Sequence, residues 1–211
     1  FPYTTLFRSS AYIPQLKQLR EDDSLPLSQT NVVFMVPKLQ DDQIGQQFIY
    51  SILDKRPKRA KVYWFVNVEV TDEPYTKKYE VSMADTDFIV KLKLYLGFRV
   101  PQEVNLYIRQ IIQELMKDGR LPLQPQRYSL TPGRNVGDFQ FVMIEEELSN
   151  ATALSKWQKQ VMQTKLFIKR HTISPERWFG LEYSDVVHET VPLVIGQMKE
   201  SSLTELRIEE R

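Results

Sequence analysis

The spacing of apolar and polar residues in the first third of the chain predicts a strand followed by a helix. Asn31–Val36 is a continuous apolar run, which is typical of a strand buried on both faces, and Pro37 closes it. Asp41 and Asp42 can then cap a helix. Its apolar residues repeat at helical spacing: Ile44, Phe48, Ile49 and Ile52.

The middle of the chain predicts three strands and a long helix. Ala60–Thr71 is rich in valine and aromatic residues, Tyr79–Met83 alternates apolar and polar residues, and Phe88–Leu96 is a further strand. The helix that follows ends at Gly119, a common C-terminal cap. Its core stripe consists of Val104, Tyr107, Ile108, Ile111, Ile112 and Leu115.

The last third begins with a long connection over residues 121–138 that is rich in proline and glycine. A strand at Phe139–Leu148, a helix from Asn150 or Thr152 to about Arg170 and a strand at Val186–Ile195 are expected to follow. The order strand, helix, strand, strand, helix, strand is a split βαβ pattern. We therefore predict an α+β fold: a mixed β-sheet with helices, in which a ferredoxin-like core gains a helix and a C-terminal strand.

A length of 211 residues suits one good-sized domain with extensions. We place that domain at residues 29–198, after a linker at residues 10–28 and before a charged tail at residues 199–211. Residues 1–9 look like the translation of a short-read sequencing adapter, so they are excluded from the fold prediction. On this interpretation, natural sequence upstream of residue 10 is missing.

Composition argues against several classes of function. The 28 lysines and arginines nearly balance the 27 acidic residues, so no large positive field favours nucleic acid. The chain has no cysteine, which excludes thiolate catalysis and cysteine-type zinc sites, and its two histidines are too few for most other zinc sites. It contains neither a GxSxG nucleophile elbow nor a phosphate-loop motif. We therefore expect no enzyme, no metal site and no cofactor in this domain.

Ordered segments of the chain resemble the cytosolic C-terminal region of the potassium uptake permease (KUP/HAK/KT) family of cation symporters, in its Gram-positive form. The matching segments cover nearly all of residues 12–196. They are Tyr12–Leu16, Ser24–Leu27, Asn31–Met35, Ser51–Leu53, Arg59–Phe65, Leu96–Pro101, Trp178–Leu181 and Val191–Gly196.

The resemblance implies that the complete protein is a plasma-membrane K⁺ symporter, with H⁺ as the expected coupling ion, and that this chain is its cytoplasmic domain. Residues 10–28 would then form the juxtamembrane linker. The residues that handle K⁺ would lie in the missing membrane part. The implied partners are the protein's own transmembrane domain and a second copy in a homodimer, and the implied role is regulatory or dimer-stabilising.

The resemblance also suggests a small anionic regulator, with cyclic di-AMP as the leading candidate. Such a ligand needs arginine or lysine for its phosphates and aromatic rings for its bases. The candidate phosphate ligands are Arg56, Lys58, Arg59 and Arg134, and the candidate stacking residues are Tyr63 and Tyr128. The alternative is that these residues form ordinary surface turns.

A second hypothesis is a free-standing βαββαβ module that binds nucleic acid or a small anionic ligand. The split βαβ order and the basic run from Lys55 to Lys61 motivate it. The near-neutral charge and the lack of an RNA-binding aromatic motif argue against it.

Overall fold

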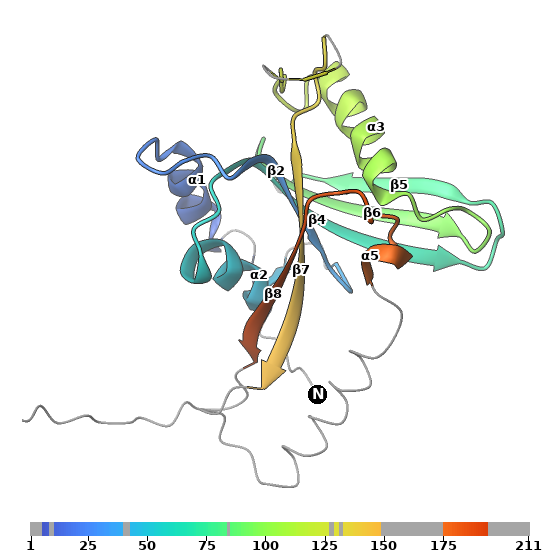
Figure 1. Cartoon of the computed structure of the whole chain (residues 1–211), viewed down its shortest axis with the longest axis horizontal. Helices are drawn as coiled ribbons and strands as arrows, with labels where there is room; N and C mark the ends of the chain where they lie inside the picture. The colour runs from blue at the N-terminus through green and yellow to red at the C-terminus, as the bar shows by residue number, and fades with distance from the viewer. Residues whose placement is uncertain are drawn as a thin grey trace, which may run out of the picture.

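A twisted six-stranded sheet organises the part of the chain that the computed structural model describes, which is residues 6–8, 11–39, 43–83, 85–126, 129–130, 133–148 and 175–193 (Figure 1). The strands lie in the order β5–β6–β4–β2–β7–β8. Their bounds are β2 Gln29–Met35, β4 Ala60–Thr71, β5 Lys77–Ser82, β6 Ile89–Gly97, β7 Phe139–Leu148 and β8 Val186–Leu193.

The sheet is mostly parallel. β2 pairs in parallel with β4 and β7, β4 with β6, and β7 with β8, whereas β5 runs antiparallel to β6 at one edge. A mixed sheet is thus confirmed, but the predicted ferredoxin-like core is not established. In a split βαβ core an antiparallel strand lies between the two parallel ones, and here β2, β4 and β6 are direct parallel neighbours. Both topologies share one order of elements along the chain, so the sequence pattern could not separate them.

Helices cover both faces of the sheet (Figure 1). Helix α3 (Val104–Lys117) packs on one face, and α1 (Ile13–Glu21), α2 (Gln46–Tyr50) and the π-helical turn η2 (Ser51–Lys55) pack on the other. The β2-to-β4 and β6-to-β7 connections advance in opposite directions across the sheet. Right-handed crossovers must then place their helices on opposite faces, as observed.

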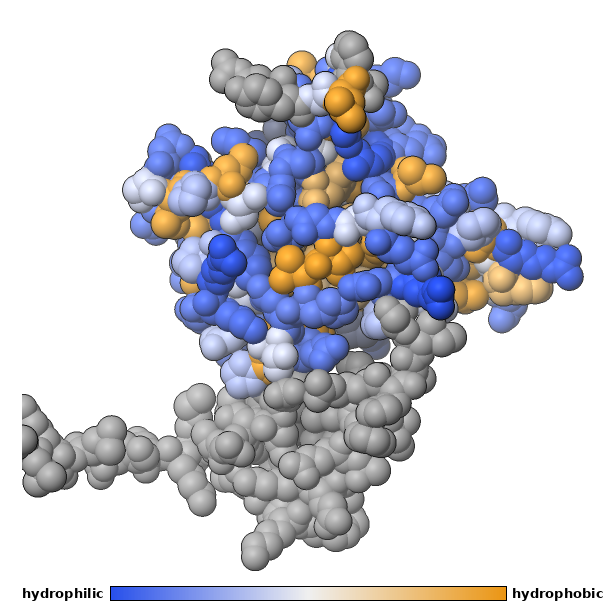
Figure 2. All heavy atoms as spheres, viewed as in Figure 1, coloured by the Kyte–Doolittle hydropathy of each residue, from blue (hydrophilic) through white to orange (hydrophobic). Residues whose placement is uncertain are grey.

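Strand periodicity divides the core into two clusters. Val33, Trp64 and Phe141 face α3, whereas the neighbouring Val32 and Tyr63 face α1 and α2. Because both faces are covered, the central strands β2 and β4 contain continuous buried apolar runs, Val32–Met35 and Val62–Val66. Polar residues cover most of the surface seen in Figure 2, with apolar residues in separate patches.

Several predicted elements are confirmed, and the predicted start of one helix is wrong. β4 and β7 span the predicted residues, and Gly119 follows α3 with a φ of +69°. The helix predicted from Asp41 begins instead at Gln46, because Gln43–Gly45 forms strand β3, which pairs with β1 (Leu6–Arg8). That the stretch containing β1 derives from an adapter stays a prediction.

The segment predicted as a linker contains α1, which packs against the sheet. Leu16 is fully buried, and Arg20 donates to the Lys61 carbonyl at 3.1 Å. Near the other end of the described chain, α5 (Pro175–Trp178) precedes β8. The helix predicted after Asn150 and the charged tail at residues 199–211 lie outside the described residues.

Candidate functional site

A groove with a volume of about 730 Å³ lies between α3 and the connection that leads to β7. Helix α3 turns its apolar stripe, including Ile108 and Ile112, toward the sheet. The intervening side chains therefore face outward along one wall of the groove. The charged residues lining it are Arg109, Lys117, Arg134 and Glu114.

A buried polar network fixes the opposite wall to the sheet. The Trp64 indole and the Gln124 amide both donate to Asn31 Oδ1 at 3.1 Å. Asn31 Nδ2 donates back to Gln124 Oε1 at 2.8 Å, and the Gly137 amide donates to the same oxygen at 3.3 Å. Gly137 lies so close to Thr30 that a Cβ atom would approach within 2.5 Å of its methyl carbon. Asn31 and Gln124 thus anchor the connection that carries Arg134.

Arg109 is held in the groove by two neighbours, Phe139 and Asn105. Its guanidinium lies 4.6 Å from the centre of the Phe139 ring, a cation–π arrangement. Its Nε donates to Asn105 Oδ1 at 2.9 Å, and Asn105 donates to Ser184 Oγ at 3.1 Å. These contacts orient the side chain and leave the terminal guanidinium nitrogens, Nη1 and Nη2, without a hydrogen-bond acceptor in the described part of the chain.

The two arginines of the groove raise its positive potential. Burial lowers the pKa of Arg109, and the charge of Arg134 lowers it further. Neither arginine has a carboxylate within ion-pair distance among the described residues. Glu114 is engaged by Tyr79 and Gln110, whose hydrogen bonds lower the pKa of its carboxyl. The groove can therefore accept an anion without displacing an ion pair.

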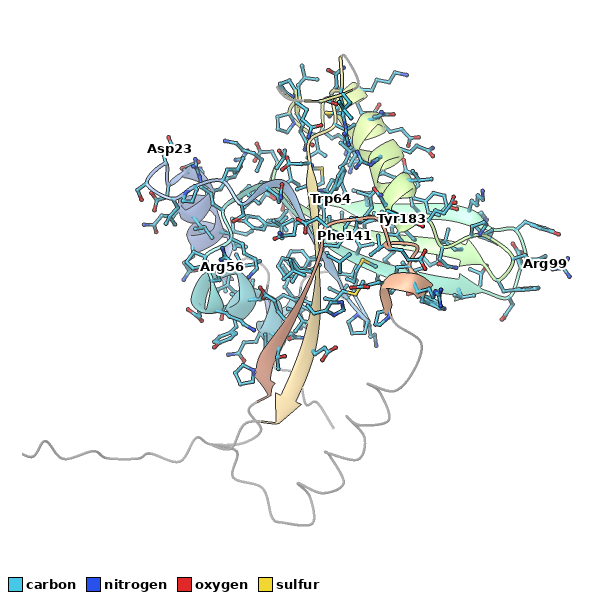
Figure 3. The ribbon with its side chains drawn as sticks, viewed as in Figure 1. Asp23, Arg56, Trp64, Arg99, Phe141 and Tyr183 are labelled. Atoms are coloured by element: carbon cyan, nitrogen blue, oxygen red, sulfur yellow. The ribbon has the colours of Figure 1, made fainter. Side chains whose placement is uncertain are left out.

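The basic run predicted from the sequence lies on the other face, beside α2. Arg56 is exposed there (Figure 3). Lys58 is buried and pairs with Glu189 of β8 at 2.9 Å, while Ser51 donates to the second carboxylate oxygen at 2.6 Å. Lys58 also donates to the Ser51 carbonyl at 2.6 Å.

Burial lowers the pKa of Lys58 more than Glu189 raises it. Burial opposes ionisation of Glu189 too, yet hydrogen bonds from Ser51 and Lys58 hold the pKa of this carboxyl below its ordinary value. Beside an ionised carboxylate at 2.9 Å, the charged lysine is the favoured form. The pair links η2 to β8.

Arg59 and Tyr63 are also occupied within the fold. Arg59 donates to the carbonyls of Arg20 and Leu25, at 3.1 and 2.8 Å, and pairs with Asp23. Tyr63 is fully buried and donates to the Lys58 carbonyl at 2.7 Å. Burial raises its pKa to about 12. A base cannot stack on this ring without opening the core.

The predicted site residues are therefore not brought together in one molecule. Arg134 lines the groove on the α3 face, the Arg56–Arg59 run lies beside α2 on the opposite face, and Tyr128 lies outside the described residues. Anion binding by these residues stays a prediction. Arg109 was not among the predicted residues, because an arginine on the polar side of an amphipathic helix carries no signal of a neighbour from a distant loop.

Residues 29–195 match a family model described as the K⁺ potassium transporter C-terminal domain. The chain belongs to this family. This confirms the resemblance found in the sequence, and it agrees with the expectation of a non-enzymatic protein, since the family is one of transporters.

Relatives of the chain carry the same description. It is 64% identical over 194 residues to the "Probable potassium transport system protein Kup" of Enterococcus faecalis, which covers 92% of this chain and 29% of that protein. The Kup protein of Streptococcus pyogenes serotype M3 is 55% identical over 206 residues, covering 98% of this chain and 31% of that protein. Both genera are Gram-positive, as the resemblance indicated.

The chain thus spans less than a third of the length of these relatives. Within the described residues, no helix combines the length and the apolar character that crossing a bilayer requires. No solved structure matches the chain.

Proposed function

We propose that this chain is the cytoplasmic part of a plasma-membrane potassium uptake transporter, in which it regulates transport or stabilises a dimer. The family match over residues 29–195 supports this proposal, together with the fraction of each relative that the chain spans. The remainder of the transporter carries K⁺, coupled to H⁺. The domain acts through contacts with that membrane part.

Regulation, on this proposal, works through a small phosphate-bearing anion, with cyclic di-AMP as the expected ligand. The observation that supports it is the pair of arginines in one groove, Arg109 and Arg134, without a carboxylate partner in the described part of the chain. Arg134 fits the role better than Lys58 or Arg59, which already have acidic partners. Arginine is suited to phosphate because its guanidinium can donate two parallel hydrogen bonds.

Calorimetric titration of residues 1–211 with cyclic di-AMP is expected to show binding that depends on the groove. Arg109→Gln and Arg134→Gln should each weaken it about 5- to 150-fold, since a charge-assisted hydrogen bond contributes roughly 1–3 kcal/mol. Arg56→Gln, which removes an exposed arginine on the opposite face, is the matched control and should leave the affinity unchanged.

Two outcomes would contradict the ligand assignment. Absence of heat with the intact chain would remove cyclic di-AMP as the ligand. Loss of affinity in Arg56→Gln with full affinity in both groove variants would move the site to the basic run.

The transporter role is tested with a chimaera. Residues 29–193 of this chain should replace the equivalent region of the Enterococcus faecalis Kup protein without loss of K⁺ uptake in a cell lacking other uptake systems, because the two sequences are 64% identical. The Kup protein truncated before this region is the comparison. Equal uptake by the truncated protein, under all conditions of K⁺ supply, would contradict a role for the domain.

A further inference from the structure

Strand β5 leaves one edge of the sheet open. It pairs with β6 on one side, and no backbone hydrogen bond to its other side is found among the described residues. All its side chains except the half-buried Val81 are exposed. Alternate amide and carbonyl groups of such a strand point outward and can pair with another strand.

The opposite edge, strand β8, is less open. Pro192 has no amide hydrogen to donate, and Lys55 already donates to the Thr190 carbonyl. Of the two edges of the described sheet, β5 is therefore the more open to a further strand.

The sequence of β5 is complementary to itself when two copies run antiparallel. If Tyr79 lies opposite Tyr79 of the second copy, Lys78 of each strand faces Glu80 of the other, which gives two opposite-charge pairs. A shift of the pairing by two residues in either direction also keeps α3 on the same side of both sheets. It places Lys78 opposite Lys78 of the second copy, or Glu80 opposite Glu80 of the second copy. Those registers are disfavoured because like charges directly opposite one another destabilise a sheet.

The two faces of such a pair are also compatible. Tyr79 and Val81 lie on the α3 side, where the Tyr79 hydroxyl donates to Glu114 and 44% of this residue's surface is exposed. The two tyrosine rings would meet at the symmetry axis and bury part of that surface. Lys78 and Glu80 lie on the opposite, polar side, where Glu80 already accepts from Tyr95 at 3.1 Å.

We propose that a second copy of this chain pairs with the β5 edge, antiparallel and in register about Tyr79, so that one sheet continues across a two-fold axis. This inference rests on the dimer-stabilising role proposed above and assigns its surface. Lysine on an edge strand usually blocks pairing. Here Lys78 excludes strands that lack an acidic residue at the matching position and so favours self-pairing over other partners.

Because the chain contains no cysteine, single cysteine substitutions report the register directly. Tyr79→Cys should form a disulfide-linked dimer under mild oxidation, since residues opposite one another in an antiparallel pair have Cα atoms about 4.5–5.5 Å apart. Ser82→Cys on the same strand is the control. Its two copies would lie about 20 Å apart along the strands, too far for a disulfide.

Charge reversal gives a second test by sedimentation velocity on residues 1–211. Lys78→Glu should raise the dimer dissociation constant roughly tenfold or more, and the double variant Lys78→Glu with Glu80→Lys should restore it. Lys61→Glu, at an exposed lysine on β4, should have no effect.

The outcomes separate the two levels of the proposal. A monomer at every concentration, with no crosslink in the Tyr79→Cys variant, overturns both this surface and the dimer-stabilising role. A dimer that ignores the charge changes and crosslinks as readily in the Ser82→Cys variant overturns the surface alone. Potassium uptake by the chimaera is independent of either result.

Discussion

Glu189→Ala is expected to lower the free energy of unfolding by about 3–5 kcal/mol, because it leaves the buried Lys58 charge without its partner. Both residues are more than nine-tenths buried, and Ser51 also loses its hydrogen-bond acceptor. The melting temperature should fall by roughly 6–20 °C for a chain of this size. Thermal and urea unfolding followed by circular dichroism measure the change.

An exposed ion pair supplies the control for Glu189→Ala. Glu182→Ala removes the partner of Arg177 at the surface and should change stability by about 0.5 kcal/mol or less. Replacing both members of the buried pair, with Lys58→Met and Glu189→Leu, should recover most of the loss, because no uncompensated charge remains. Equal stability of Glu189→Ala and Glu182→Ala would mean that the pair does not fasten η2 to β8.

The same pair predicts a dependence of stability on pH. The pKa of Glu189 is lower in the folded chain than its ordinary value of 4.5, so the folded state favours the ionised form. Its contribution is therefore complete above that value and is lost as the pH falls through the folded-state pKa. The Lys58→Met, Glu189→Leu variant should lose less stability than the unsubstituted chain below about pH 4.5.

Asn31→Ala is expected to lower the free energy of unfolding by about 2–4 kcal/mol, because the Asn31 side chain is the hydrogen-bond partner of three buried groups. Without it the Trp64 indole N–H and both ends of the Gln124 amide lose a partner. The connection carrying Arg134 would also lose its anchor, so binding of an anion in the groove should weaken together with stability. Equilibrium unfolding in urea gives the first quantity and calorimetry the second.

Asn135→Ala is the matched control, since Asn135 lies in the same connection but outside the buried network. It should change the unfolding free energy by about 0.5 kcal/mol or less. Gln124→Ala should lower the free energy of unfolding much less in the Asn31→Ala variant than in the unsubstituted chain, because the two side chains belong to one network. Additive losses would contradict the network as described.

Periodicity predicted the elements of this fold well where one pattern dominated. The apolar runs at residues 60–71 and 139–148 match β4 and β7, and the stripe that ends at Gly119 matches α3. The start of α2 was placed too early because β3 pairs with a strand distant in the sequence, and no local pattern reports such a partner. The family resemblance was also accessible from the sequence, as the match over residues 29–195 confirms.

The candidate site was harder to predict from the sequence than the fold. A cluster of cations in the sequence indicated Lys58 and Arg59, yet the fold provides both with carboxylates, Glu189 and Asp23, from distant segments. Arg134 was among the predicted ligands, but its neighbour Arg109 was not. The two arginines belong to different elements and meet because the Asn31–Gln124 network folds the connection back toward α3.

The sequence by itself determined the long strands β4 and β7, helix α3 and the family to which the chain belongs, because periodicity and ordered motifs are properties of the linear chain. Strand order, the parallel pairing and the partner of each charge were decided only by the tertiary structure. These depend on which distant segments meet, and a lysine has the same local sequence whether it faces water, a phosphate or a buried glutamate. Lys58 and Arg134 looked alike in the sequence, and the sheet placed one in the core and the other in an open groove.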